Sequence, residues 1–368
     1  MKNIITNSNH KPNFVDFTRT KNSHPTFILS LTRCCTQNCT FCAVDALYCH
    51  SITGCRDRAY TEQLIGRELT PDQWCSVIDK LITANPYAEF DLSGGDCLAL
   101  PWVYLQLIPH ILERVQTRKQ ISVTSTATSI QTYFEETHNI SSAQRPGAMH
   151  VTFDGCREYS FENIRLAAKI NEFEMDLHVE CPLTVENCTP SKIQEIFLTA
   201  KNAHVSEILL MRYFPVGRGS QLYGLDGLNP SPNMYRFAIH MFLQLASQHP
   251  DGPTIKVQCA LKQFSNQQTG VAQCKMGDGT WCVMPNGALL ICPWAYGLEG
   301  NPLDDTFVAG NILRDEYGEC RSRAQDLRAT LHRKYPMECR VIRFVDENNH
   351  DPKNRDRRHQ WFKERILA

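Results

Sequence analysis

The feature that most constrains this chain is a short loop with three closely spaced cysteines. Cys35, Cys39 and Cys42 are separated by three and then two residues, and they follow the apolar run 26–31, which predicts a β-strand. Three thiolates on one loop can bind three irons of a 4Fe–4S cube and leave the fourth iron open to another ligand. A structural zinc site would instead need a second cysteine pair or histidines, and the sequence next to this loop supplies neither.

The same residues resemble the radical S-adenosylmethionine (SAM) superfamily. The spacing CxxxCxxC after a first strand, with the aromatic residue Phe41 before the last cysteine, is similar to the motif of that family. The resemblance implies that the open iron binds SAM, and that reductive cleavage of SAM gives a 5′-deoxyadenosyl radical that abstracts hydrogen from a substrate. Cys34 is adjacent to Cys35 but does not fit this spacing, so we interpret it as a neighbour of the site.

Composition narrows the class of protein. The chain has 368 residues, 17 cysteines and a formal net charge of −1. For this length, the cysteines are too few for a disulfide scaffold, and they indicate metal binding in a reducing compartment. A chain that is almost neutral has no global field to attract nucleic acid or a membrane surface. No signal peptide or long apolar run is evident, so we expect a soluble cytoplasmic protein.

Strand-like and helix-like segments alternate through residues 25–220 and predict an α/β fold with a parallel sheet. Thr70-Pro71 and Thr189-Pro190 each predict the start of an amphipathic helix. Six segments are predicted as strands: 26–31, 88–93, 120–125, 149–153, 177–181 and 207–211. Six units match the partial (β/α)6 barrel that the resemblance implies, with the active groups at the C-terminal ends of the strands.

Small and polar residues follow several of these strands. Gly94-Gly95 ends the second one, and glycine lets the backbone approach a ligand closely. The family carries Gly-Gly-Glu at this position, and its backbone contacts SAM; here Asp96 replaces the glutamate. The SAM-binding residues that the resemblance implies are Phe41, Gly94, Gly95, Asp96, Ser125, Thr152 and Met211. Ordinary hydrogen bonding at strand ends is an equal explanation for the two hydroxyls in this set.

Residues 221–368 carry cysteines that lie far apart in the sequence. Cys274 and Cys292 flank the segment 285–287, Pro-Asn-Gly, which predicts a tight hairpin turn that brings the two thiols together. This pattern resembles the shorter, Twitch form of the SPASM/Twitch extension, which carries an auxiliary 4Fe–4S cluster. The auxiliary ligands that the resemblance implies are Cys274, Cys292, Cys320 and Cys339, with Cys259 and Cys282 as substitutes. Buried thiols in a lid over the substrate are the alternative.

Three further predictions concern the rest of the chain. Cys97 and Cys181 lie near strand ends, where a thiol can donate a hydrogen atom to a substrate radical, although packing is the commoner role of a cysteine. Residues 1–24 are polar and without periodicity, and we expect a loose arm. The basic segment 353–367 is expected to form a docked terminal helix, and contact with RNA or an acidic peptide is the alternative.

The predicted function is that of a radical SAM enzyme acting on a peptide side chain or a small metabolite, by oxidation, cross-linking or epimerisation. The resemblance implies an electron donor such as a flavodoxin or a ferredoxin. RNA modification is an alternative, but the near-neutral charge argues against it. A non-catalytic iron–sulfur or zinc protein is the third possibility, and it would leave the Gly94-Gly95 turn and the repeated strand–helix units without a purpose.

Overall fold

The computed structural model describes residues 24–221, 228–265, 274–336 and 339–349. The expected N-terminal arm lies outside these ranges except for its last residue, and the expected basic terminal helix lies wholly outside them. Within the described ranges, no helix is both long enough and apolar enough to span a membrane.

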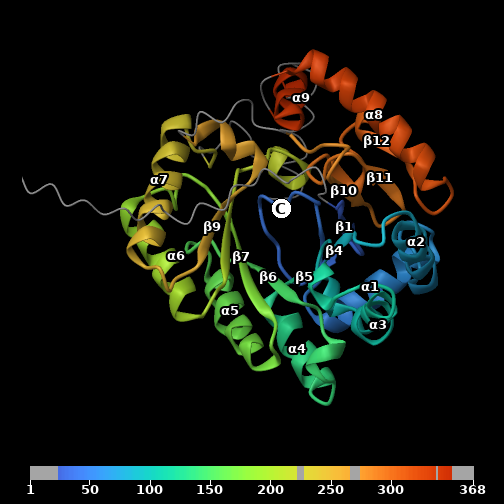
Figure 1. Cartoon of the computed structure of the whole chain (residues 1–368), viewed down its shortest axis with the longest axis horizontal. Helices are drawn as coiled ribbons and strands as arrows, with labels where there is room; N and C mark the ends of the chain where they lie inside the picture. Colours follow the sequence, from blue (N-terminus) through green and yellow to red (C-terminus); the bar gives the residue numbers. More distant parts are fainter. Residues whose placement is uncertain (1–23, 222–227, 266–273, 337–338, 350–368) are drawn as a thin grey trace, which may run out of the picture.

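A ten-stranded sheet forms the centre of the molecule, in the order β12-β11-β10-β1-β4-β5-β6-β7-β8-β9. The six predicted strands are confirmed and are consecutive in this sheet, each parallel to the next. They are β1 (Thr26–Ser30), β4 (Glu89–Ser93), β5 (Ile121–Ser125), β6 (Ala148–Thr152), β7 (Asp176–Pro182) and β8 (Glu207–Met211). Figure 1 shows these strands curving around a common centre with helices outside them, as in a partial barrel.

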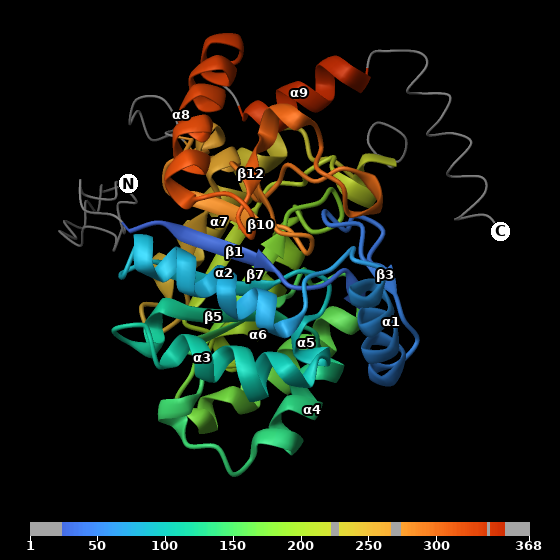
Figure 2. The same ribbon diagram turned by 90° about the vertical axis from the view of Figure 1, so that its right-hand side faces the viewer.

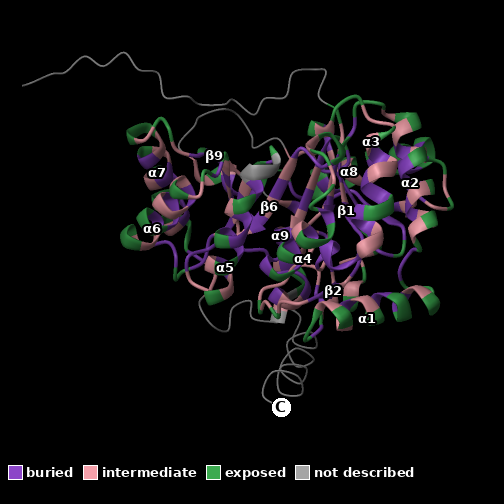
Figure 3. Ribbon diagram, turned by 90° about the horizontal axis from the view of Figure 1, so that it is seen from below, coloured by how far each residue is buried: buried purple, intermediate pink, exposed green. Residues whose placement is uncertain are grey.

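Alternation of side chains explains the two faces of this barrel. In β6, the buried Met149 and Val151 alternate with the partly exposed His150 and Thr152, and β7 has the same pattern. The buried set packs under the surrounding helices, so the partly exposed set lines the inside of the barrel. Figure 3 shows buried residues concentrated in the strands and on the inner sides of the helices.

Two of the outer helices begin at Pro71 and Pro190, directly after Thr70 and Thr189, as predicted. The outer helices are α1 (Ile52–Leu64), α2 (Pro71–Ala84), α3 (Ile108–Leu112), α4 (Ala127–Thr137), α5 (Glu158–Ala167) and α6 (Pro190–Asn202). At the start of α2, the Thr70 side chain accepts a hydrogen bond from the Gln73 amide, and the Gln73 side chain accepts one from the Thr70 amide. This reciprocal capping box satisfies amides that the first helical turn would otherwise leave unpaired.

The C-terminal part extends the barrel sheet at both edges, which the sequence did not predict. After α7 (Pro232–Gln248), the short strand β9 (Thr254–Val257) pairs in parallel with β8. At the other edge, β10 (Thr280–Val283) pairs in parallel with β1, and β11 (Ala288–Leu290) and β12 (Val308–Asn311) continue the sheet antiparallel. Figure 2 shows α8 (Tyr317–Lys334) and α9 (Arg340–Asn349) on this side of the molecule.

The turn between β10 and β11 differs in detail from the expected one. Of the Asn286-Gly287 pair, only Gly287 has a positive φ angle, of 82°. The predicted hairpin turn is confirmed, because β10 and β11 pair antiparallel on either side of it. Residues 284–287 form the turn, which is closed by a 2.9 Å hydrogen bond from the Gly287 amide to the Met284 carbonyl and needs positive φ at Gly287 alone.

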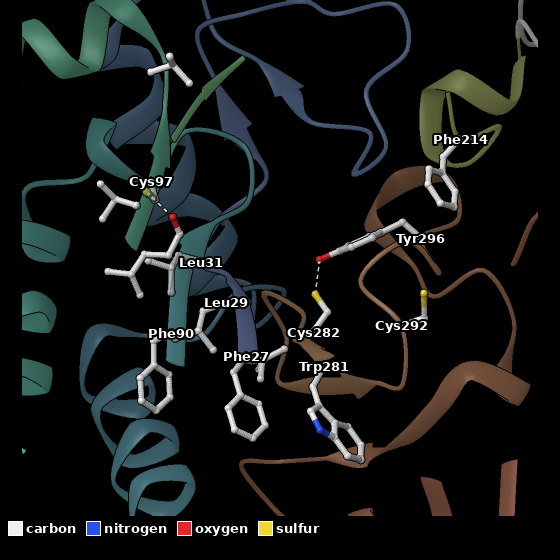
Figure 4. Packing of buried hydrophobic residues seen from close by; sticks show 14 of the residues in the cluster. Phe27, Leu29, Leu31, Phe90, Cys97, Phe214, Trp281, Cys282, Cys292 and Tyr296 are labelled. Atoms are coloured by element: carbon white, nitrogen blue, oxygen red, sulfur yellow. Dashed lines mark hydrogen bonds between the residues drawn. The ribbon is translucent and has the colours of Figure 1, made fainter. Parts of the chain in front are cut away.

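Aromatic packing joins this extension to the barrel. Phe27 of β1 stacks on Phe90 of β4 and on Trp281 of β10, with ring centres 6.0 and 6.5 Å apart. Figure 4 shows the three side chains side by side across neighbouring strands. All three are at most 1% exposed. The two parts of the chain therefore share one hydrophobic core.

Candidate functional site

The three-cysteine loop (residues 32–49, here the cluster loop) leaves β1 at its C-terminal end. Its two arms pair with each other as β2 (Cys34–Cys35) and β3 (Leu47–Tyr48). The Leu47 amide donates to the Arg33 carbonyl at 2.7 Å, and the Cys49 amide donates to the Cys35 carbonyl at 2.8 Å. This pairing closes the base of the loop, and Cys39 and Cys42 lie in the segment between the two paired strands.

Gly94 and Gly95 bring the end of β4 against the cluster loop. The Gly95 amide donates to the Thr32 carbonyl at 2.7 Å. A Cβ added at Gly94 would lie 2.5 Å from the same carbonyl oxygen, and one added at Gly95 would lie 2.3 Å from the Cys34 carbonyl oxygen. The close backbone approach that we predicted toward SAM is thus made toward the loop itself, and it requires glycine at both positions.

Asp96 ties the cluster loop to two strands and a helix. Its carboxylate is fully buried, and it accepts hydrogen bonds from hydroxyl groups on β5, at the start of α4 and on the cluster loop. The donors are Ser125, Thr126 and Ser129, each at 2.6 Å, and Thr36 at 3.3 Å. Burial raises the pKa of Asp96, while the hydroxyl donors lower it. Asp96 and Ser125, both expected to contact SAM, therefore bind each other through their side chains.

Each sulfur of the predicted cluster motif accepts one hydrogen bond. The donors are the Gln37 amide to Cys35 at 3.3 Å, the Ala46 amide to Cys42 at 3.4 Å and the Tyr159 hydroxyl to Cys39 at 3.2 Å. Burial raises the pKa of Cys35 and of Cys42. Three sulfurs that each accept a hydrogen bond fit an iron–sulfur cluster, and metal binding would keep the buried Cys35 thiolate ionised where burial alone would protonate it.

Tyr159 is positioned by a chain of polar side chains. The Arg157 guanidinium donates to the buried Asp154 carboxylate at 2.5 Å and also to the Tyr159 hydroxyl. The same guanidinium lies 4.2 Å from the ring centre of Phe41, the aromatic residue of the motif. Burial and the Cys39 thiolate both raise the pKa of Tyr159, so this hydroxyl stays protonated and donates to Cys39. The sequence analysis identified neither Arg157 nor Tyr159.

Arg218, in the turn that follows β8, clamps the other side of the cluster loop. Its amide donates to the Cys42 carbonyl at 3.0 Å. Its guanidinium donates to the Asn38 side chain at 2.6 Å and to the Cys39 carbonyl at 3.1 Å. A Cβ at Gly217 would lie 2.1 Å from a backbone carbonyl of the loop. The sequence analysis did not identify the contact between this turn and the cluster loop.

A second group of thiols forms in the C-terminal part from Cys259, Cys274, Cys292 and Cys339. Burial raises the pKa of Cys292, and the thiolates of Cys274, Cys339 and Cys259 raise it further. Burial and the thiolates of Cys339 and Cys274 raise the pKa of Cys259 to about 12. Burial raises the pKa of Cys339 to about 11, and the Cys274 thiolate adds to this effect. These mutual effects make the four thiols candidates for one group of auxiliary ligands, in which Cys292 is buried, Cys274 and Cys339 are partly exposed and Cys259 is exposed.

One expected auxiliary ligand has different surroundings from the other three. Burial and Asp315 raise the pKa of the Cys320 thiol on α8 and Arg323 lowers it, whereas the thiols of the second group act on one another. The choice between Cys320 and the substitute Cys259 as fourth ligand stays a prediction. Cys282, the other substitute, is fully buried, with its sulfur 3.0 Å from the Tyr296 hydroxyl (Figure 4).

The remaining expected residues divide into two sets. Thr152 and Met211 end β6 and β8, at the edge of the sheet where the cluster loop lies, and their role as SAM contacts remains a prediction. Cys97 and Cys181 are fully buried in the hydrophobic core. Cys97 donates to the carbonyls of Leu92 and Thr124, at 3.4 and 3.3 Å. This burial favours packing over hydrogen-atom donation.

Comparison with known proteins identifies the fold. No protein-family model matches the chain, and no curated protein sequence matches it either. The structure of anSMEcpe with bound AdoMet has a TM-score of 0.54 and 11% sequence identity, over 82% of this chain and 79% of that chain. AdoMet is SAM. A second anSMEcpe structure, with AdoMet and the Cp18Cys peptide, has a TM-score of 0.54 and 12% identity, over 82% of both chains.

Streptococcus suis SuiB bound to precursor peptide SuiA is also similar. Its TM-score is 0.56 at 12% identity, and the match covers 80% of this chain and 64% of SuiB. These matches extend over the barrel and into the C-terminal part. The chain therefore has the same fold as these proteins, and the α/β barrel with a C-terminal extension that its sequence predicts is confirmed.

Proposed function

We propose that this chain is a radical SAM enzyme that abstracts hydrogen from a peptide substrate. The observation that carries the proposal is the cluster loop, in which Cys35, Cys39 and Cys42 lie at the C-terminal end of β1 with one hydrogen-bond donor for each sulfur. Supporting it, anSMEcpe has the same fold with AdoMet bound.

The residues of the cluster loop fit a 4Fe–4S cluster bound by three cysteines. When bound, the cluster would supply the electron that cleaves SAM to the radical that abstracts hydrogen. The protein's part is to fix the loop: Gly95 and Asp96 attach it to β4, and Arg218 clamps its other side. The proposed contacts for SAM are the strand-end residues Gly94, Gly95, Thr152 and Met211, together with Phe41.

The second group would bind an auxiliary cluster with all four irons ligated. Cys259, Cys274, Cys292 and Cys339 supply the usual complement of four thiolates. Such a cluster has no open iron for SAM, and we propose that it transfers an electron from the substrate radical. A flavodoxin or a ferredoxin is the proposed external electron donor.

A peptide is the favoured substrate class because two of the similar structures contain one. SuiB is bound to the precursor peptide SuiA, and anSMEcpe to the Cp18Cys peptide. The inside of the barrel in this chain carries polar and charged side chains, among them Asp91, His150 and Glu180. Such side chains can hydrogen-bond the backbone and polar groups of a peptide.

The proposal is tested by cleavage of SAM. The chain is reconstituted with iron and sulfide without oxygen and reduced with dithionite, and 5′-deoxyadenosine is measured by mass spectrometry. The wild type should form it, and the variant with Ala at Cys35, Cys39 and Cys42 should lose about four irons and all product. Cys34→Ala is the matched control, a buried cysteine of the same loop outside the motif, and it should retain activity. Product from the triple variant would refute the proposal.

A further inference from the structure

Three strands place an unusual set of side chains inside the barrel. Asp91 of β4, His150 of β6 and Glu180 of β7 each offer one ligand atom, and these atoms all lie within 4.8 Å of one another. Neither the cysteine chemistry nor the SAM contacts proposed above use these residues. A carboxylate pair with an imidazole nitrogen is a donor set typical of divalent transition metals.

The strand register explains how the three meet. Asp91 pairs with Ser122 of β5, Thr124 of β5 pairs with His150, and all of them point into the barrel. Because the β5 side chains are small, Asp91 and His150 reach each other across that strand. Glu180 is on the next strand, two residues beyond the residue that pairs with His150. The four consecutive parallel strands β4, β5, β6 and β7 fix these groups rigidly.

Two of the three groups are oriented by other side chains. The Asp91 carboxylate accepts hydrogen bonds from the hydroxyls of Ser122 at 3.1 Å and Thr124 at 3.3 Å, both to the same oxygen. His150 Nε2 lies 3.1 Å from His178 Nδ1. Ligands of bound metals are supported by outer hydrogen bonds of this kind, which fix their orientation.

The histidine pair orients the ring of His150. Its Nε2 faces His178 Nδ1, and its Nδ1 faces the Glu180 carboxylate, 3.8 Å away. The side chains of His150 and Glu180 are 20% and 21% exposed, so a solvated ion can reach them.

We propose that Asp91, His150 and Glu180 bind one divalent transition-metal ion inside the barrel. Metal–ligand bonds of about 2.0–2.2 Å give ligand separations of roughly 3.3 Å in a tetrahedral site, so the three groups need to move together by only about 1 Å. Three protein ligands leave further coordination positions open to the lumen, where water or a substrate oxygen can bind. The site depends on neither iron–sulfur cluster.

Mn²⁺ is the most discriminating probe, because it prefers oxygen and imidazole ligands and avoids the many cysteine thiols of this chain. The reconstituted protein is titrated with MnCl₂, and free Mn²⁺ is followed by its electron paramagnetic resonance signal. We expect one site per wild-type chain. Asp91→Asn, His150→Gln and Glu180→Gln should each weaken it at least about 100-fold, and His178→Phe about 10–100-fold.

Glu207→Gln is the matched control, because this carboxylate also lies inside the barrel but forms an ion pair with Lys256 outside the triad. It should leave Mn²⁺ affinity unchanged, and iron content and thermal unfolding confirm that each variant is folded. No tight Mn²⁺ binding in the wild type, or equal affinity in the control and the triad variants, would overturn the proposal and leave His150 as a counter-ion of two carboxylates. SAM cleavage plays no part in this measurement, so its outcome is independent of the proposed function.

Discussion

The two cysteine groups of this chain are built in opposite ways. Cys35, Cys39 and Cys42 lie on one short loop, and the surrounding fold attaches to that loop through glycine backbone contacts, Asp96, Arg218 and Tyr159. The second group takes its four cysteines from separate segments: one after β9, one before β10, one after β11 and one before α9. The first group is a local sequence motif to which the fold attaches. The second group comes together only when the fold brings distant segments of the chain close to one another.

This difference predicts different consequences of metal loss. The cluster loop is connected to the barrel by many hydrogen bonds that do not involve sulfur, so losing its metal should abolish chemistry but leave the barrel folded. The second group joins segments whose link would be the metal itself. Losing that metal should loosen the extension, because coordination energy contributes directly to the stability of a metal-linked domain.

The largest effect is expected where the loop meets β4. In Gly95→Ala, the new Cβ would lie 2.3 Å from the Cys34 carbonyl oxygen, and rigid backbone on both sides prevents relief. We expect the free energy of unfolding to fall by about 3 kcal/mol, measured by denaturant unfolding. We also expect the variant to lose the cluster, which is about four irons by iron analysis.

Gly318→Ala, on α8, is the matched control for this substitution. Nothing lies within 4 Å of its added Cβ, so helix propensity should stabilise the protein by up to about 1 kcal/mol. If Gly95→Ala instead keeps its iron and loses only SAM affinity, the glycine contacts SAM, as its position in the sequence predicts.

The sequence predicted the barrel strands and the cluster loop because both are local patterns. Short apolar, strand-like runs that alternate with helix-like segments identified the six strands, and spacing identified Cys35, Cys39 and Cys42. The pairing of β10 with β1 was missed because it joins segments far apart in the sequence and is fixed by the packing of Phe27 on Trp281. The local hairpin predicted that Cys274 and Cys292 lie close together. Cys259 and Cys320 are far from this hairpin in the sequence, so spacing could not decide which of them is a further auxiliary ligand.

Replacing each of those two cysteines by alanine tests which of them belongs to the second group. Cys259→Ala should reduce the reconstituted protein from about eight irons to about four, because the three remaining thiolates of the second group come from separate segments and are not held together on one loop as in the first group. Cys320→Ala should keep about eight irons and lose about 1 kcal/mol in the free energy of unfolding, since it only removes a buried sulfur. Iron analysis and thermal unfolding of both variants decide which of the two cysteines is an auxiliary ligand. The reverse result would restore the ligand set expected from the sequence.

The smallest expected effect concerns the hydroxyl that contacts the cluster loop. Tyr159→Phe removes the hydrogen bond to Cys39 Sγ and leaves the ring in place. A reduced cluster carries more negative charge on its sulfurs than an oxidised one, so a donor to sulfur favours reduction. Its loss should make the midpoint potential more negative by about 60 mV, which corresponds to about 1.4 kcal/mol for one electron.

The measurement is a redox titration of the reconstituted protein followed by electron paramagnetic resonance, in the Cys259→Ala background so that one cluster is observed. Tyr104→Phe is the matched control, because its hydroxyl bonds to Glu136 and not to a cysteine. It should leave the potential unchanged. An unchanged potential in Tyr159→Phe would mean that Tyr159 only packs against the loop. The hydrogen bonds to the sulfurs of the first group would then have no effect on its chemistry. The first group would differ from the second only in the backbone contacts that attach its loop to the barrel.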